Sequence, residues 1–93
     1  MAYYLLFYDV VDNFVERRAP FRQTHLMLAQ RAHERGELVM AGAFGEPVAG
    51  AVLLFRSDDG STAEDFAKSD PYVGAGLVPA WRVGKWHEVL TGG

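Results

Sequence analysis

The stretch that decides the fold runs from Tyr3 to Val10 and reads Tyr-Tyr-Leu-Leu-Phe-Tyr-Asp-Val. It is rich in aromatic and aliphatic side chains and too short for an ordinary helix, so it predicts a β-strand. Side chains alternate between the two faces of a strand, so Tyr3 and Phe7 lie on one face, whereas Tyr4 and Tyr8 lie on the other. Both faces are apolar, which is typical of a strand that is covered on both sides.

Further elements follow from the hydrophobic pattern and the turn residues. The patterns predict a polar connection over Asp12–Arg18, a helix from about Pro20 to Gly36, strands over Glu37–Phe44 and Ala49–Arg56, a short helix that stops by Asp70-Pro71, an irregular segment over Tyr72–Val78 and a last strand over Ala80–Leu90. Gly36 supports the first helix end, because glycine is common just past a helix C-terminus. Pro71 ends the second helix, because proline disfavours helical geometry in the residue before it.

The first predicted helix has an apolar face. Placing successive residues about 100° apart brings four apolar side chains into one stripe: Phe21, Leu28, Ala29 and Ala32. His25 sits in the middle of this stripe, whereas Met27 falls on the polar side.

The second predicted helix begins with a recognisable signal. Ser61 and Glu64 match a capping box, in which the two side chains bond free amides of the first turn. Its inward-facing side chains are Ala63, Phe66 and Ala67. In the last strand we expect a bulge near Gly84, where the inward parity of the apolar residues slips.

The element order β-α-β-β-α-β predicts a single α+β domain over residues 1–93. The usual solution is the ferredoxin-like arrangement, a four-stranded antiparallel sheet with both helices on one face. The other face should be bare and apolar, because the first strand is apolar on both sides. An exposed apolar patch of several hundred Å² is unusual for a monomer. We therefore expect a homodimer that packs sheet against sheet through a two-fold interface.

Composition excludes several classes of function. Apolar residues make up 49% and charged residues 23% of the chain, which are globular rather than disordered proportions. The net charge is −3 and no basic cluster occurs, so nucleic acid is not an expected partner. Cysteine is absent, which excludes thiol nucleophiles and thiolate metal sites. The apolar start lacks a basic n-region and is too short to span a membrane, so we expect a cytoplasmic protein with no membrane partner.

His25 is the most informative single position. A buried imidazole needs a hydrogen-bond partner, or it loses about 1–3 kcal/mol. One interpretation is a core histidine bonded to a backbone carbonyl. The other is an acid–base group, because imidazoles titrate near neutrality, and a nearby carboxylate favours the charged form whereas burial disfavours it.

Asp70 is the carboxylate that we pair with His25, since it lies where the second helix ends and the chain turns at Pro71. An alternative role is structural, because an aspartate before a proline is also a good cap for a new helical turn, accepting the amide of Tyr72 or Val73. The two roles are compatible, because one carboxylate oxygen can cap the turn while the other faces an imidazole.

Other side chains could shape a pocket for a small-molecule ligand. Arg22 lies one turn before His25 and could reach a substrate anion, or could equally be a surface arginine. Several aromatic residues could line a flat pocket for a ring-bearing ligand, or could be core or interface packing: Tyr8, Phe44, Tyr72 and Trp81. His33 and His87 have no identifiable partner, and we expect both to be solvated.

The motifs of other chemistries are missing. His25 and His33 lack the i, i+4 spacing of a helical zinc pair, and no H-E-x-x-H occurs, so we expect no metal. No G-x-S-x-G marks a serine nucleophile. Gly74-Ala75-Gly76 is not a dinucleotide motif, because Pro79 occupies the third glycine position and no strand precedes it. We therefore expect no cofactor.

Two motifs occur in order along the chain. Residues 22–26 read Arg-Gln-Thr-His-Leu, and residues 69–73 read Ser-Asp-Pro-Tyr-Val, followed by Ala-Gly-Leu at 75–77. They resemble the Arg-x-x-His-Leu and the Asp-Pro-Tyr and Ala-Gly motifs of the YciI-like, or YCII-related, family in the dimeric α/β-barrel, ferredoxin-like group. The resemblance extends over almost the whole chain, to a final strand that matches from Trp81 to Trp86.

The resemblance implies that His25 and Asp70 form a His-Asp dyad, and some relatives are dehydrochlorinase-like enzymes that act on hydroxylated aromatic rings. The chain also departs from the family pattern. Gln23 and Thr24 replace a common Pro and Ala, and Ala51 replaces a common Ser in the third strand. Losing that hydroxyl group changes what the pocket can bind, so the identity of the substrate is not implied.

The main functional hypothesis is a cofactor-independent lyase or isomerase. In it, Asp70 orients His25, and His25 moves a proton on a small phenolic or enolic substrate. A first alternative is a non-catalytic ligand-binding or accessory module in which the pair is a buried support. A second alternative is a cofactor-free oxygenase of the dimeric α/β-barrel type.

Overall fold

The sheet is antiparallel throughout, and the computed structural model describes residues 1–90 of the chain. Within those residues it contains four strands in the order β2-β3-β1-β4. The strands are β1 (Ala2–Asp9), β2 (Leu38–Phe44), β3 (Gly50–Ser57) and β4 (Ala80–Trp86). The apolar strand predicted from the start of the chain is therefore central, between β3 and β4.

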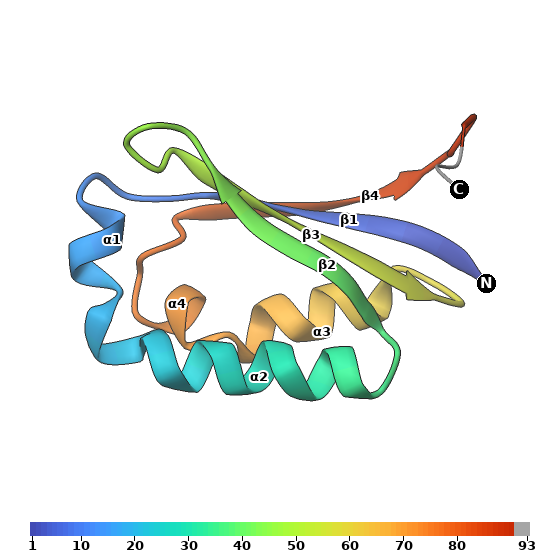
Figure 1. Ribbon diagram of the computed structural model, residues 1–93, viewed down its shortest axis with the longest axis horizontal. Helices are drawn as coiled ribbons and strands as arrows, with labels where there is room; N and C mark the ends of the chain where they lie inside the picture. Colours follow the sequence, from blue (N-terminus) through green and yellow to red (C-terminus); the bar gives the residue numbers. More distant parts are fainter. Residues whose placement is uncertain (91–93) are drawn as a thin grey trace.

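The two longer helices lie on one face of the sheet, as Figure 1 shows. The helical segments are α1 (Phe14–Arg17), the short 3₁₀ helix η1 (Ala19–Phe21), α2 (Arg22–Glu34), α3 (Ser61–Ser69) and α4 (Pro71–Gly74). This order and layering confirm the predicted ferredoxin-like α+β fold. Every helix within residues 1–90 falls short of the length and apolarity needed to cross a membrane.

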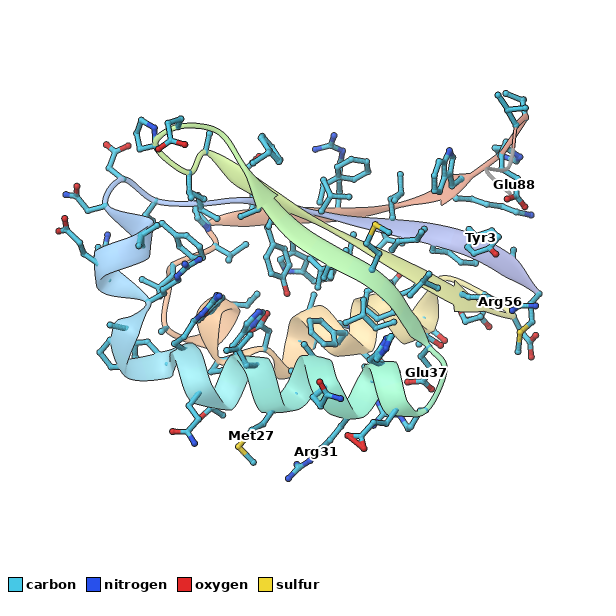
Figure 2. All side chains as sticks on the ribbon, in the orientation of Figure 1. Tyr3, Met27, Arg31, Glu37, Arg56 and Glu88 are labelled. Atoms are coloured by element: carbon cyan, nitrogen blue, oxygen red, sulfur yellow. The ribbon has the colours of Figure 1, made fainter. Side chains whose placement is uncertain are left out.

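The core fills the layer between the sheet and the helices. Leu6 of β1 lies opposite Leu53 of β3, and both side chains are buried. The ring of Phe55 packs against the ring of Phe66 from α3, with centroids 5.3 Å apart. On α2, Figure 2 shows Met27 pointing away from the sheet, on the polar side as predicted.

The first helix ends where the sequence predicted. Gly36 has a φ of +78°, a left-handed conformation that glycine adopts without steric cost. The segment before this helix differs from the prediction, because it is more than a polar connection. Phe14 is buried there, and the one-turn helix α1 forms around it.

The predicted capping box at Ser61 is wrong. The residue before the helix is Gly60, which has no side chain to cap the helix. Instead, the carboxylate of Asp59 accepts hydrogen bonds from both the amide and the hydroxyl group of Ser61. The serine hydroxyl group is therefore hydrogen-bonded to the preceding turn and does not cap the helix.

The segment predicted as irregular begins with the one-turn helix α4. Asp70 has an extended ψ of 123°, and its side chain accepts the amide of Tyr72 at 3.0 Å. Pro71 occupies the first helical position, where its missing amide costs nothing. The capping role considered for Asp70 is thus confirmed.

The last strand is shorter than predicted and carries no bulge. β4 ends at Trp86 rather than Leu90, and it pairs with β1 in unbroken register across Gly84. The apparent slip in parity arises because Trp86 lies opposite Tyr3 on the face away from the helices. The register shift within residues 1–90 occurs in β2 instead, between Leu38 and Met40.

The face of the sheet away from the helices is largely apolar, as predicted, and no helix covers it in Figures 1 and 2. Arg82 also lies on this face, with its guanidinium 4.3 Å from the ring centroid of Phe7. Its centre pairs Leu5 with Leu54 and Phe7 with Val52. Large apolar side chains around this centre are strongly exposed: Met40 by 70%, Phe44 by 53% and Trp86 by 46%. We call this surface the open face.

Candidate active site

Three elements bring the candidate site together. α2 supplies His25, the junction of α3 and α4 supplies Asp70, and β1 supplies Tyr8. Because Pro71 disfavours helical geometry in the residue before it, Asp70 is extended and the chain bends there. The Asp70 side chain is turned into the core and is only 1% exposed.

The buried Asp70 carboxylate has three hydrogen-bonding neighbours. Nδ1 of His25 lies 2.9 Å from Oδ1 and 3.0 Å from Oδ2. The hydroxyl group of Tyr8 donates to Oδ2 at 2.8 Å, and the amide of Tyr72 donates to Oδ1 at 3.0 Å. A buried charge with this many donors is satisfied without water.

This geometry assigns the proton on the imidazole. An ionised carboxylate can only accept hydrogen bonds, so Nδ1 of His25 carries the hydrogen that lies toward Asp70. In the neutral ring Nε2 is then the unprotonated nitrogen. Nε2 has no hydrogen bond to any of residues 1–90, so it can accept a proton from a ligand.

Aromatic rings hold the imidazole in place. The ring of Tyr72 stacks on His25 with centroids 4.0 Å apart and an interplanar angle of 11°. Phe66 meets the imidazole edge-on at 6.4 Å. The His25 side chain remains 14% exposed, so it packs against two aromatic rings and is still accessible to a small molecule.

Tyr8 acts as a hydrogen-bond donor. Burial, and then the charge and hydrogen bond of Asp70, raise the pKa of Tyr8 far above its ordinary value. Its hydroxyl group therefore stays protonated at ordinary pH and donates to Asp70. The sequence analysis placed Tyr8 in the pocket as a ring for ligand contact, and its polar end has this additional role.

A cavity of about 240 Å³ lies beside the imidazole. Its lining is mostly apolar and comes from α1, α2, α4 and the first three strands: Tyr8, Phe14, Arg18, Arg22, His25, Leu26, Ala29, Ala41, Gly42, Ala43, Val48, Ala51, Leu53 and Tyr72. A dry cavity of about 150 Å³ accommodates benzene, so this volume suits a single ring with a few substituents.

Two arginines line the cavity beside the aromatic rings. Nη1 of Arg22 donates to the hydroxyl group of Tyr72 at 3.2 Å. The guanidinium of Arg18 lies 5.3 Å from the ring centroid of Phe14, and that ring meets Tyr72 edge-on at 5.4 Å. Positive charge is therefore fixed at the same cavity as the imidazole.

Most of the residues predicted for the site do meet. His25, Asp70, Tyr8, Tyr72 and Arg22 converge, although Asp70 lies behind the imidazole rather than in the cavity wall.

Two of the aromatic residues considered for the pocket lie outside it. Phe44 does not line the cavity, because its neighbour Ala43 does and successive strand residues point to opposite faces. Phe44 belongs to the open face instead. Trp81 packs against the core without reaching the cavity wall.

Phe14 and Arg18 line the cavity but were not predicted from the sequence. Both lie in the segment interpreted as a polar connection, and a one-turn helix is too short to show a hydrophobic period. The available signal was a lone aromatic residue in an otherwise polar segment. Ala51, which stands where the family often has Ser, does line the cavity.

The remaining histidines lie apart from this site. His33 is exposed, as expected, and it also has a partner that the sequence did not identify, because its Nδ1 lies 2.8 Å from the carbonyl oxygen of Leu38. His87 follows β4 and is exposed. Within residues 1–90, no group of three His, Cys, Asp or Glu side chains could hold a metal ion.

Comparison with known proteins gives a family and a fold. The model of the YCII-related domain matches residues 1–87. The structure is similar to that of 5-chloro-2-hydroxyhydroquinone dehydrochlorinase (TftG) from Burkholderia phenoliruptrix AC1100 in complex with 2,5-dihydroxybenzoquinone. That match has a TM-score of 0.74 at 18% identity and covers 91% of this chain and 93% of that chain.

A second solved structure shows the same fold. It is described as an antibiotic biosynthesis monooxygenase, with a TM-score of 0.58 at 11% identity, covering 97% of this chain and 100% of that one. A search of curated proteins found no match. At these identities the two structures support the fold alone.

Proposed function

Because the chain belongs to the YCII-related domain family, we propose that it is a cofactor-independent acid–base enzyme in which His25 moves a proton on a small phenolic or enolic substrate. The observation that carries this proposal is the open Nε2 of an imidazole whose Nδ1 is held by Asp70 beside a cavity of about 240 Å³. A fixed tautomer with a free basic nitrogen is what general acid–base catalysis needs.

Each residue has a distinct part in this proposal. Asp70 orients the ring and supports the positive charge that His25 gains when Nε2 takes up a proton. The stacked ring of Tyr72 keeps the imidazole in position while it reacts. Arg22 contacts the substrate from the side of Tyr72, and Tyr8 acts through Asp70.

Loss of HCl from a chlorinated hydroxyhydroquinone illustrates the chemistry. A hydroxyl proton first moves to the chlorine-bearing ring carbon, which gives a ketone. Nε2 of His25 then accepts a second hydroxyl proton while the C–Cl bond breaks. The products are a hydroxyquinone, chloride and a proton, so the step needs no external oxidant.

Turnover of 5-chloro-2-hydroxyhydroquinone, followed by chloride release, tests the proposal. Positioned acid–base catalysis contributes about 10²–10⁴-fold in rate, so His25→Ala should lose about that factor. His87→Gln is the matched control, because His87 is an exposed histidine outside the site. Chloride release by His25→Ala at the wild-type rate would contradict the assigned role.

The same assay separates the alternatives. An oxygenase would consume oxygen during turnover, whereas elimination proceeds equally well without air. A binding or accessory module would bind the phenol without turnover in either condition.

We also infer that the working unit is a homodimer. The open face is apolar and uncovered in one chain, and contiguous apolar patches of this kind mark interaction sites. A second copy of the chain, packed through the same surface, would cover the open face of each protomer. The cytoplasmic location expected from the sequence stays a prediction.

A further inference from the structure

Two arginines in this protein differ from the rest in their surroundings. Arg18 and Arg22 are half-buried, whereas the other arginines are exposed: Arg17, Arg31, Arg35, Arg56 and Arg82. Both half-buried arginines line the cavity beside His25. Partial burial removes some of their hydration, so a favourable partner is needed to offset that cost.

No carboxylate supplies that partner. The ion pairs of His25 with Asp70 and of Arg35 with Glu37 include neither Arg18 nor Arg22. The carboxylate of Asp70, which lies behind the imidazole, already accepts hydrogen bonds from its own donors. The charge of both arginines is therefore uncompensated within the described part of the chain.

Aromatic groups fix the two guanidiniums instead. Arg18 lies over the ring of Phe14, and Arg22 uses one N–H on the hydroxyl group of Tyr72. A guanidinium has five N–H donors, so most of them remain available. Contacts with neutral rings position a cation without cancelling its charge.

The rest of the cavity wall is apolar. The side chains of Leu26, Ala29, Val48 and Leu53 contribute hydrocarbon, and the strand β2 contributes small residues. The wall therefore divides into an apolar part that suits a ring and a cationic part that suits an anion. The cavity wall thus carries local positive charge, although the chain as a whole has a net charge of −3.

Resting on the proposed function of the same cavity, we propose that the preferred substrate is a single-ring phenol or enol that also carries a carboxylate group. Arg18 and Arg22 bind this carboxylate while the ring faces His25. A planar guanidinium matches the two oxygens of a carboxylate, which makes arginine the preferred partner for this group. The cavity volume of about 240 Å³ leaves room for one ring and such a substituent.

Binding of benzoate and of its neutral counterpart benzamide, followed by NMR titration of the backbone amides, tests this inference. Wild-type protein should bind benzoate about tenfold or more tightly than benzamide, because a hydrogen bond to a charged group contributes about 1.5–3 kcal/mol. Arg18→Gln and Arg22→Gln should each weaken benzoate binding about tenfold and leave benzamide binding unchanged.

Two further variants make the test specific. Arg17→Gln removes an exposed arginine next to Arg18 and should leave benzoate binding unchanged. Arg22→Lys keeps the positive charge and should retain more benzoate binding than Arg22→Gln. Absence of benzoate binding, equal affinity of wild type for the two probes, or an equal loss in Arg17→Gln would overturn the inference.

The result is independent of the proposed proton transfer. His25→Ala should keep the preference for benzoate, because the arginines and their aromatic contacts are unchanged. If the preference persists while His25→Ala still turns over substrate, the anion site stands and the catalytic role of His25 fails. If the preference is missing, the anion site fails whatever the role of His25.

Discussion

Asp70 is a single buried charge shared among three donors. Nδ1 of His25 lies 2.9 Å from one carboxylate oxygen and 3.0 Å from the other. The hydroxyl group of Tyr8 and the amide of Tyr72 each donate to one of these oxygens. The amide contact fixes the carboxylate to the backbone of α4. The imidazole is therefore positioned by a group that is itself held rigidly, which is a requirement for catalytic geometry.

Asp70→Asn tests this positioning at the scale of one residue. The asparagine amide can direct N–H groups toward Nδ1, which favours the tautomer with the proton on Nε2 and removes the basic nitrogen from the cavity. We expect kcat to fall on the order of 10²-fold or more with little change in KM. Steady-state kinetics on 5-chloro-2-hydroxyhydroquinone would measure both constants.

The matched control for that variant is Asp65→Asn, because Asp65 is an exposed carboxylate on α3. It should leave kcat unchanged. Tyr8→Phe keeps the Asp70 carboxylate and removes only one of its donors, so its loss should be smaller than that of Asp70→Asn. A wild-type kcat in Asp70→Asn would show that Asp70 serves only as the cap of α4.

At the scale of elements, the site depends on how α3 begins and ends. Asp59 caps the start of α3 through Ser61, and Pro71 forces the bend that turns Asp70 into the core. The same nine-residue helix places Phe66 against the imidazole and against Phe55. A change in the position of α3 therefore moves both Asp70 and Phe66 relative to His25 on α2.

The cap of α3 predicts a pH-dependent stability. Hydrogen bonds from the hydroxyl and amide of Ser61 hold the pKa of Asp59 below its ordinary value of 3.8. Because the folded-state pKa is lowered, this stabilisation is present above about pH 4 and is lost as the pH falls through the folded-state value. Asp59→Ala should therefore lower the melting temperature at pH 7 and lower it less at pH 2.5.

Thermal unfolding followed by circular dichroism would measure this difference. Asp58→Ala is the neighbouring control, and its effect should be smaller at pH 7 because Asp58 does not contact Ser61. An Asp59→Ala penalty that stays the same at both pH values would contradict the assigned cap.

The sequence predicted the longer elements because each has a strong pattern. Residues 3–8 are all aromatic or aliphatic, and the stripe through Ala32 repeats with a helical period, so both elements appear where expected. α1 escaped prediction because one turn has no period to detect. The position of Phe44 on the open face was also not predicted. The irregularity between Leu38 and Met40 changes which residues of β2 face the helices, and a bulge leaves no clear signal in one sequence.

The candidate site was predictable to a similar degree. His25 and Asp70 are 45 residues apart, but a local feature of the sequence predicted an inward side chain at each position. For His25 the feature is the apolar stripe of the helix, and for Asp70 it is the bend before Pro71. The additional donor from Tyr8 and the position of Arg18 depend on the packing of distant elements. Local pattern does not carry that information.

At the scale of the whole molecule, the open face sets the expected assembly. Leu54 lies at its centre, paired with Leu5 on one side and Met40 on the other. We expect the wild-type protein to be a dimer in sedimentation equilibrium, and Leu54→Glu to be a folded monomer, because burying an unpaired carboxylate in an apolar interface is strongly unfavourable.

Met27→Glu is the control for that variant. Met27 is similarly apolar, but it lies on α2 and points away from the sheet, as Figure 2 shows. It should leave the dimer intact. A wild-type monomer, or a Leu54→Glu dimer, would contradict assembly through the open face.

The most direct test of the central claim is the rate at which the protein exchanges the ring hydrogens of 2-hydroxyhydroquinone with D₂O, measured by proton NMR without air. This exchange needs only proton transfer and no leaving group. The account predicts that wild-type protein and His87→Gln accelerate exchange by about 10²–10⁴-fold over buffer, and that His25→Ala returns it to the buffer rate. Exchange by His25→Ala at the wild-type rate would contradict the account.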